Sequence, residues 1–150
     1  MKIQYIKAYT DNYIWLIRTN EGNLVIDPGE SKPVESFTSH EDIQINDILL
    51  THHHYDHVGG VLDLKKNILG KVVGPNNSQI NGIDHHVVDG ETFQSCGLEF
   101  SVIEIQAIHW IILHILLMMG ISQYYSVEIL FSQLVVAECL KVHISKCMNH

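Results

Sequence analysis

The ten residues at positions 51–60 constrain this 150-residue chain more than any other stretch. They read Thr-His-His-His-Tyr-Asp-His-Val-Gly-Gly, so four imidazoles and one carboxylate fall within six positions. Neutral imidazole and carboxylate are good ligands for first-row metals, and histidine is the commonest of them. Because no cysteine lies nearby, the set favours a catalytic zinc-type site over a closed structural site.

The spacing of these ligands predicts how the site is assembled. Residues 48–50 form an apolar run that is typical of a buried strand. If the chain stays extended beyond it, His52 and His54 point the same way and can reach one ion, whereas His53 points away. We therefore exclude His53 as a ligand and expect it to be structural.

A turn into a helix after the extended segment would redirect Asp56 and His57 toward a second ion close by. Gly59 and Gly60 would let the surrounding backbone pack closely around the site. Two ions on one loop indicate a binuclear hydrolase, in which a bridging hydroxide attacks a carbonyl or phosphoryl centre. The alternative is an adventitious, tag-like cluster, but tags sit at chain ends and this stretch lies between two apolar segments.

The stretch resembles the Thr-His-x-His-x-Asp-His-x-Gly-Gly signature of the metallo-β-lactamase superfamily. More narrowly, residues 1–105 resemble glyoxalase II, the hydroxyacylglutathione hydrolases. The resemblance implies an α/β fold, namely the N-terminal half of a metallo-β-lactamase-like αββα sandwich with metals at one edge of the sheets. It rests on four further segments: residues 9–15 (YTDNYIW), 24–30 (LVIDPGE), 90–93 (GETF) and 100–105 (FSVIEI).

The same resemblance implies a reaction and a cofactor. Its members hydrolyse the thioester of S-2-hydroxyacylglutathione, such as S-lactoylglutathione, to glutathione and a 2-hydroxy acid. The cofactor is two Zn²⁺, with Fe or Mn as alternatives. By family roles, His52 and His54 bind the first ion, and Asp56 and His57 bind the second. The nucleophile is the metal-bound hydroxide, so no catalytic side chain is expected, and the glutathione-binding residues belong to a later helical region that we do not find here.

Two further groups of residues need interpretation. The segment Asp27-Pro28-Gly29 is a strong turn signal, which makes Asp27 an ordinary turn residue. By resemblance, Asp27 is instead a buried acid that orients the metal loop, as carboxylates do when they fix histidine tautomers. Both readings stay open. His85 and His86 lack the spacing partners of the first cluster, so we expect them to be structural or exposed.

Alternating apolar residues and intervening turn signals predict a chain dominated by strands, with short helices between them. Asp11 and Asn12 are typical of a turn. The expected helices cover residues 32–40 and 61–66. The expected strands cover residues 2–8, 13–18, 24–26, 43–50, 71–74, 85–88, 93–94 and 98–105.

Composition limits the partners and the compartment. A net charge of −8 gives no basic footprint, so we expect no nucleic-acid partner. The apolar run at residues 108–119 is shorter than the roughly 20 residues that cross a bilayer, and the first residues do not resemble a signal peptide. Cys96, Cys139 and Cys147 form no zinc or redox spacing, which favours a reducing compartment. We expect a cytoplasmic monomer that acts on a small-molecule glutathione thioester.

The resemblance stops after Ile105. In the resembled family, the strand ending there is followed by Pro-Gly-His-Thr-x-Gly/Asp-His, whose first histidine completes one metal site. Residues 106–110 read QAIHW, so His109 comes one residue late, and a shift of one residue reverses the face of a strand side chain. His109 is therefore a weaker metal-ligand candidate. Residues 106–150 also lack Pro, Asp and Arg, and Gly120 is their only glycine.

The genetic code suggests a cause for this change. If one base was lost after the codon for Ile105, residues 106–112 can be encoded so that the restored frame reads Pro-Gly-His-Thr-Leu-Asp-His. Residues 126–131 likewise permit Cys-Gly-Asp-Thr-Leu, and residues 135–138 permit Cys-Gly-Arg. We therefore divide the chain into residues 1–105, a metallo-β-lactamase-like part, and residues 106–150, an aberrant, frameshifted tail. The alternative is a genuine but divergent C-terminus.

Two functions follow from the two alternatives. By resemblance, the chain is a zinc-dependent thioester hydrolase whose activity is impaired by the truncation, or it is an inactive, truncated or pseudogene-like product with at most weak metal binding. Other members of the superfamily, such as lactamases and nucleases, fit less well, because the flanking segments favour glyoxalase II.

The coding DNA distinguishes a frameshift from divergence. We expect that one base added after the Ile105 codon opens a frame reading Pro-Gly-His-Thr-Leu-Asp-His and continuing past codon 150. Sequencing codons 100 to 140, and then onward past codon 150, checks this. A shifted frame that reads as nonsense or stops early would show that the tail is genuine.

Overall fold

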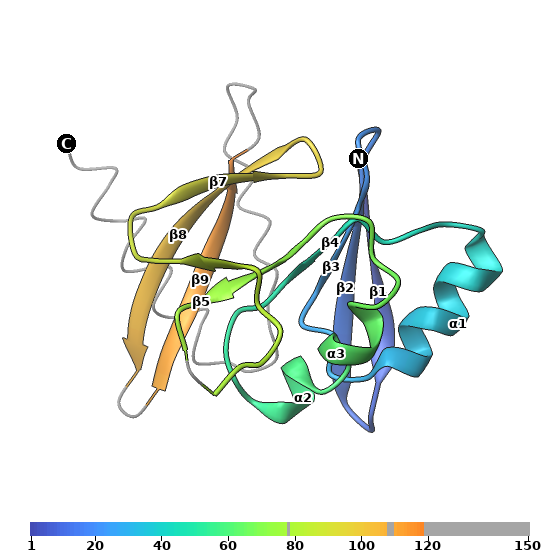
Figure 1. Ribbon diagram of the computed structural model, residues 1–150, viewed down its shortest axis with the longest axis horizontal. Coiled ribbons are helices and arrows are strands. Elements are labelled where there is room, and N and C mark those ends of the chain that lie inside the picture. The colour runs from blue at the N-terminus through green and yellow to red at the C-terminus, as the bar shows by residue number, and fades with distance from the viewer. Residues whose placement is uncertain (78, 108–109, 119–150) are drawn as a thin grey trace.

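Two β-sheets form the framework of the molecule, for which a computed structural model describes residues 1–77, 79–107 and 110–118. The larger sheet has six strands and the smaller has three, and in each sheet neighbouring strands follow one another in the sequence. Figure 1 shows the two sheets side by side, with the helices beside the larger one. The larger sheet contains β1 (Lys2–Ala8), β2 (Asn12–Arg18), β3 (Asn23–Ile26), β4 (Asp47–Leu49), β5 (Val72–Pro75) and β6 (His85–Val87). The smaller contains β7 (Thr92–Ser95), β8 (Leu98–Ala107) and β9 (Trp110–Met118).

The order of the strands brings three turns to one edge of the larger sheet. Strands β1, β2 and β3 are antiparallel neighbours, whereas β3, β4, β5 and β6 are parallel. Parallel neighbours need crossover connections, which here contain α1 (Ser31–Glu41) and then α2 (Tyr55–Val58) and α3 (Val61–Leu64). The β1–β2 turn and the segments after β3 and β4 therefore meet at the lower edge in Figure 1.

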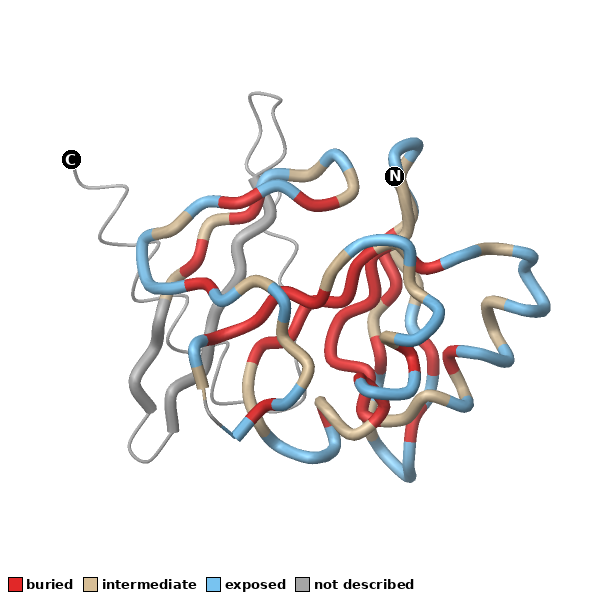
Figure 2. Tube along the Cα trace, in the orientation of Figure 1, coloured by how far each residue is buried: buried red, intermediate tan, exposed pale blue. Residues whose placement is uncertain are grey.

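Alternation along the central strands divides the core into two layers. Val25, Ile48 and Val72 pack on the helix side of the larger sheet, with Val34 of α1 and Val61 of α3. Their sequence neighbours face the other way and pack against the smaller sheet; they are Leu24, Ile26, Leu49 and Val73. Figure 2 shows the buried residues concentrated along these strands. Strands that are buried on both faces read as continuous apolar runs, which explains their sequences.

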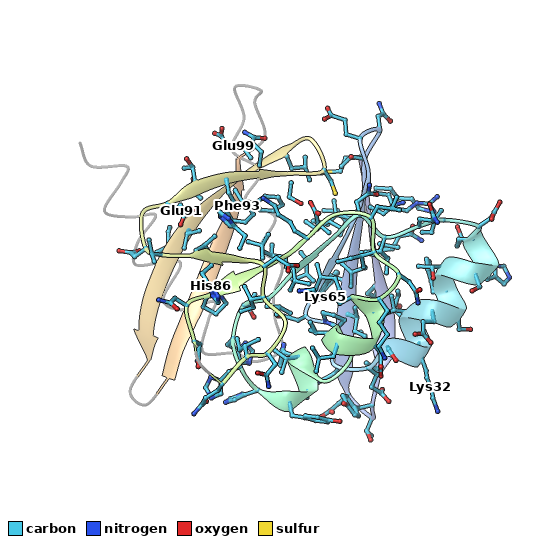
Figure 3. All side chains as sticks on the ribbon, viewed as in Figure 1. Lys32, Lys65, His86, Glu91, Phe93 and Glu99 are labelled. Atoms are coloured by element: carbon cyan, nitrogen blue, oxygen red, sulfur yellow. The ribbon has the colours of Figure 1, made fainter. Side chains whose placement is uncertain are left out.

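Aromatic stacking helps to fill the space between the sheets. Phe93 of β7 and Phe100 of β8 stack with ring centroids 5.2 Å apart and planes inclined by 15°. Both belong to the layer that also contains Ile17 of β2. Figure 3 shows Phe93 among the side chains between the two sheets. On the helix side, Lys65 follows α3 and donates a hydrogen bond to the carbonyl oxygen of Gly82, 2.7 Å away, which ties α3 to the segment before β6.

Most of the predicted elements are confirmed. The expected strands correspond to β1 to β8, and the helix expected at residues 32–40 is α1. The predicted α/β class is also confirmed, because helices connect parallel strands of a mixed sheet. Strand β8 continues two residues past Ile105 to Ala107, and β9 pairs with it in antiparallel fashion. The division at residue 105 stays a prediction, and His109, Cys139 and Cys147 lie outside the described residues.

The part of the chain that the structure describes contains no helix that is long and apolar enough to cross a membrane.

Gly60 tests how closely the loop after β4 approaches the turn after β3. Its φ of −88° is open to any residue, but an added Cβ would lie 2.5 Å from backbone atoms of Glu30 and Ser31. We expect Gly60→Ala to lower the free energy of unfolding by about 3 kcal/mol, because neither backbone can move away easily. Chemical denaturation measures this value.

Gly90 provides the matched control for this substitution. It has a φ of +78°, and nothing lies within 4 Å of an added Cβ. Gly90→Ala should therefore cost only the conformational strain, about 1 kcal/mol. Equal losses in the two variants would contradict the close approach at Gly60.

Candidate metal centre

The predicted ligands lie where β4 ends, beside the turn that follows β3. The chain leaves β4 in extended form, and His54 still has φ −62° and ψ 141°. Helix α2 then begins at Tyr55, with the backbone N–H groups of His57 and Val58 donating to the carbonyl oxygen of His54. The predicted change from extended chain to helix is therefore confirmed. It places His57 in a buried position, whereas Asp56 stays exposed.

The carboxylate of Asp27 joins the two segments. Asp27 is 1% exposed, and it follows β3 with a positive φ of 50°, a conformation that aspartate tolerates better than most residues. The backbone N–H of Thr51 donates to Oδ1 at 2.8 Å, and the Thr51 hydroxyl donates to Oδ2 at 2.6 Å. A buried carboxylate requires such partners. Of its two readings, the buried acid beside the metal loop matches this geometry.

Thr51 connects Asp27 to His52 and orients the His52 ring. Its hydroxyl oxygen lies 2.9 Å from Nδ1 of His52. Because the hydroxyl gives its proton to Asp27, it can only accept from His52, so Nδ1 carries the proton and Nε2 keeps a lone pair. Burial and the neighbouring His57 lower the pKa of His52 to about 4. The ring is therefore neutral at pH 7, which is the form that binds metals.

His57 lies between two carboxylates. Its Nδ1 is 3.1 Å from Oδ2 of Asp27, a charge contact that lacks the alignment of a hydrogen bond. Its Nε2 is 3.6 Å from Oδ2 of Asp56. Burial acts to lower the pKa of His57, but the two carboxylates raise it overall. Partial burial acts to raise the pKa of Asp56, but a hydrogen bond from Asn12 and the charge of His57 lower it overall.

Three imidazole rings, those of His52, His54 and His57, lie close together at this site. The ring centroid of His52 lies 4.0 Å from that of His57 and 4.7 Å from that of His54. Potential ligand atoms of Asp27, His52 and His57 all lie within 4.8 Å of one another. Within residues 1–77, 79–107 and 110–118, no other set of three such residues meets this criterion. His54 and Asp56 lie at the exposed rim of the cluster.

Three other histidines in the described part of the chain lie apart from the cluster or at its margin. Nδ1 of His53 is buried, and its ring lies 5.1 Å from that of His54. Nε2 of His85 is 3.2 Å from a carboxylate oxygen of Glu91, and Nδ1 of His86 is 3.4 Å from the carbonyl oxygen of Pro75. These two contacts connect β6 to the segment before β7 and to β5.

Sequence reasoning missed Asn12. Its side-chain amide donates to Oδ2 of Asp56 at 2.7 Å and to the Asp56 carbonyl oxygen at 3.3 Å. In the sequence Asn12 was indistinguishable from an ordinary turn residue, because 44 positions separate the two partners.

Comparison with known proteins identifies the superfamily of the chain. The sequence model of the metallo-beta-lactamase superfamily matches residues 10–114. The chain belongs to this superfamily. Two solved structures share the fold: the B3 metallo-beta-lactamase BLEG-1, with a TM-score of 0.67 and 16% identity over 77% of this chain and 67% of that one, and the class B3 di-zinc metallo-beta-lactamase LRA-12 from an Alaskan soil metagenome, with a TM-score of 0.62 and 19% identity over 81% and 56%.

Curated relatives give a narrower similarity. The chain is 43% identical to a hydroxyacylglutathione hydrolase of Pseudomonas aeruginosa over 108 residues, which are 70% of this chain and 42% of the relative. It is 41% identical to a hydroxyacylglutathione hydrolase of Nitrosomonas eutropha over 102 residues, which are 67% and 40%. The chain thus spans about two fifths of the length of these relatives.

The contact between Asp27 and His57 predicts a change in titration. In metal-free protein, Asp27→Asn should lower the pKa of His57, because a negative charge beside Nδ1 is lost. The folded pKa is raised, so protonated His57 stabilises the fold below about pH 6.5, and this contribution disappears as pH rises through the folded pKa. The contribution should shrink in the variant.

NMR titration of the imidazole resonances measures this change. Asp63→Asn is the control, because Asp63 is an exposed carboxylate paired with Lys66. A His57 pKa that is the same in both variants would contradict the assigned contact.

Proposed function

We propose that the chain carries the metal loop of a zinc-dependent hydrolase that acts on the thioester of S-2-hydroxyacylglutathione. The observation that carries the proposal is the link from Asp27 through Thr51 to His52, which leaves Nε2 of a neutral imidazole available within a group of metal-binding atoms. The substrate class is supported by two relatives, each more than 40% identical, that are hydroxyacylglutathione hydrolases.

The residues present fit a zinc site. His52 and His54 would hold one ion, and Asp56 and His57 would hold a second, with Fe or Mn as alternatives to Zn. The ring distances of 4.0 and 4.7 Å bring these imidazoles close enough to share a small site. Asp27 would not need to bind the metal, because both of its oxygens already accept hydrogen bonds from Thr51.

Zinc bound at such a site lowers the pKa of a water molecule and polarises a carbonyl group. The chain's own residues prepare for this chemistry. Asp27 and Thr51 orient His52, and burial keeps its imidazole neutral. The proposed reaction adds one water across the thioester bond: the acyl carbon gains the hydroxyl group to give a 2-hydroxy acid, and the sulfur gains the proton to give glutathione.

The reaction fits a reducing compartment such as the cytoplasm. Glutathione is a thiol, and the described part of the chain has a free cysteine, Cys96, that is half-buried. Sparse, unpaired cysteines are typical of proteins in such compartments. We further propose that the active species is a monomer without nucleic-acid or membrane partners.

A second candidate is a chain that binds metal weakly without turnover. The observation that favours it is that only Asp27, His52 and His57 satisfy the 4.8 Å criterion within the described residues. His54 and Asp56 lie at the exposed rim, and His109 lies outside the described residues. We propose that residues 106–150 are a frameshifted tail, in which case ligands that the family supplies after residue 105 are lost and turnover is lost with them.

Zinc binding and turnover of the purified 150-residue chain test the first candidate. The first candidate predicts about two zinc ions per chain and hydrolysis of S-lactoylglutathione that releases a thiol, whereas a frameshifted tail predicts less than one ion and no thiol release. His52→Ala and His57→Ala should each remove at least one zinc ion and the turnover, whereas His86→Ala should keep both, because His86 lies at the edge of the sheet. Metal analysis and a thiol-reactive dye give the two readings.

The outcomes separate the two candidates. Two ions with turnover would exclude the second candidate. Less than one ion per chain without turnover would exclude the first for this chain. Equal zinc loss in His86→Ala and His52→Ala would contradict the assigned site, because it would show that binding does not depend on the loop.

A further inference from the structure

The first residue of β2, Asn12, contacts the metal loop. The side-chain amide of Asn12 donates to Oδ2 of Asp56 at 2.7 Å and to the carbonyl oxygen of the same residue at 3.3 Å. One side chain therefore holds both the main chain and the carboxylate of Asp56. Such a pair of contacts limits rotation of the carboxylate as well as movement of the backbone that carries it.

Asp56 needs this support because it lies at the surface. Its side chain is 49% exposed, so water competes for its oxygens and the side chain would otherwise move between rotamers. The oxygen that accepts the hydrogen bond from Asn12 is the one that lies 3.6 Å from Nε2 of His57. Asn12 thus holds the carboxylate beside the nitrogen with which it would share an ion.

The turn between β1 and β2 adds two hydrogen bonds to the segment after β3. The Tyr9 hydroxyl donates to the carbonyl oxygen of Gly29 at 2.9 Å, and the Tyr9 backbone N–H donates to a carboxylate oxygen of Glu30 at 2.6 Å. Gly29 in turn touches the metal loop so closely that an added Cβ would lie 1.9 Å from the carbonyl oxygen of Asp56. Tyr9 therefore contacts Gly29, and Gly29 contacts Asp56. Asn12, three residues after Tyr9, contacts Asp56 as well.

We propose that Asn12 is a positioning residue that fixes the carboxylate of Asp56 for the second metal ion and has little effect on the first. This inference rests on the proposed function, because it assigns Asp56 and His57 to one ion. Asn12 would act only through Asp56. Both of its side-chain hydrogen bonds go to Asp56, whereas His52 and His54 would hold the other ion.

The test measures the affinities of the two ions separately. Metal-free 150-residue chain is titrated with Zn²⁺ against a competing chelator, and with Co²⁺ while the visible spectrum is recorded. In Asn12→Ala the second ion should bind about 10- to 100-fold more weakly, as when other supporting contacts of metal ligands are lost. The first ion should bind as in the wild type. Asn12→Gln, which keeps the amide donor on a longer side chain, should restore part of the loss.

Asn23→Ala is the matched control. Asn23 also donates a side-chain hydrogen bond to a backbone carbonyl oxygen, that of Gln44 at 2.7 Å, but its partner is remote from the metal loop. The control should bind both ions like the wild type. Thermal unfolding of all four proteins shows whether a variant has simply lost its fold, in which case Asn12→Asp, which keeps the size but loses the donor, replaces Asn12→Ala.

Each result has a definite meaning. Two ions in the wild type with unchanged affinities in the Asn12 variants would overturn this inference and leave the proposed function intact. Equal weakening of both ions would also overturn it, because it would indicate a general structural effect. Absence of a second ion from the wild type would overturn both proposals, and it would be visible before any variant was compared.

Discussion

A buried carboxylate must find partners for both oxygens, and at Asp27 these partners all come from one short segment. The backbone and hydroxyl of Thr51 satisfy both oxygens, and His57 lies 3.1 Å from one of them. The end of β3 is thereby fixed to the end of β4 through side-chain chemistry as well as through the sheet. The tautomer of His52 is set by the same contacts.

A second buried carboxylate acts at the opposite edge of the larger sheet, with a different outcome. Asp47 accepts the backbone N–H of Lys71 at 2.9 Å and the hydroxyl of Ser95 at 2.5 Å. Ser95 belongs to β7, so this carboxylate ties the two sheets together. The partners of Asp47 are a peptide group and a hydroxyl. The hydrogen bonds of Asp27 instead lead through Thr51 to His52, whose Nε2 keeps a lone pair for a metal. The need of a buried carboxylate for hydrogen-bond partners therefore joins the two sheets at one edge and orients a candidate metal ligand at the other.

The sequence was most informative where structure depends on near neighbours. Alternation of apolar residues predicted the strands, and the spacing within residues 51–60 predicted the passage from extended chain to helix, because both are local patterns. Two readings of Asp27 stayed open because a turn residue and a buried ligand-orienting acid look alike in sequence. Asn12 was missed because its partner Asp56 is 44 positions away, a distance over which a single sequence carries no pairing signal.

The candidate ligands are close together in sequence, but the groups that orient them come from 24 and 44 positions earlier in the chain. A peptide containing only the ligand loop would have the same donor atoms without their fixed tautomers and directions. Formation of the oriented site therefore depends on closure of two long loops, whose entropy is lost when the sheet forms. An ion that binds only the oriented site therefore also stabilises the contacts that close these two loops, those of Asp27 with Thr51 and of Asn12 with Asp56. Amide hydrogen exchange in the β1–β2 turn would then slow when metal binds, although that turn contributes no candidate ligand.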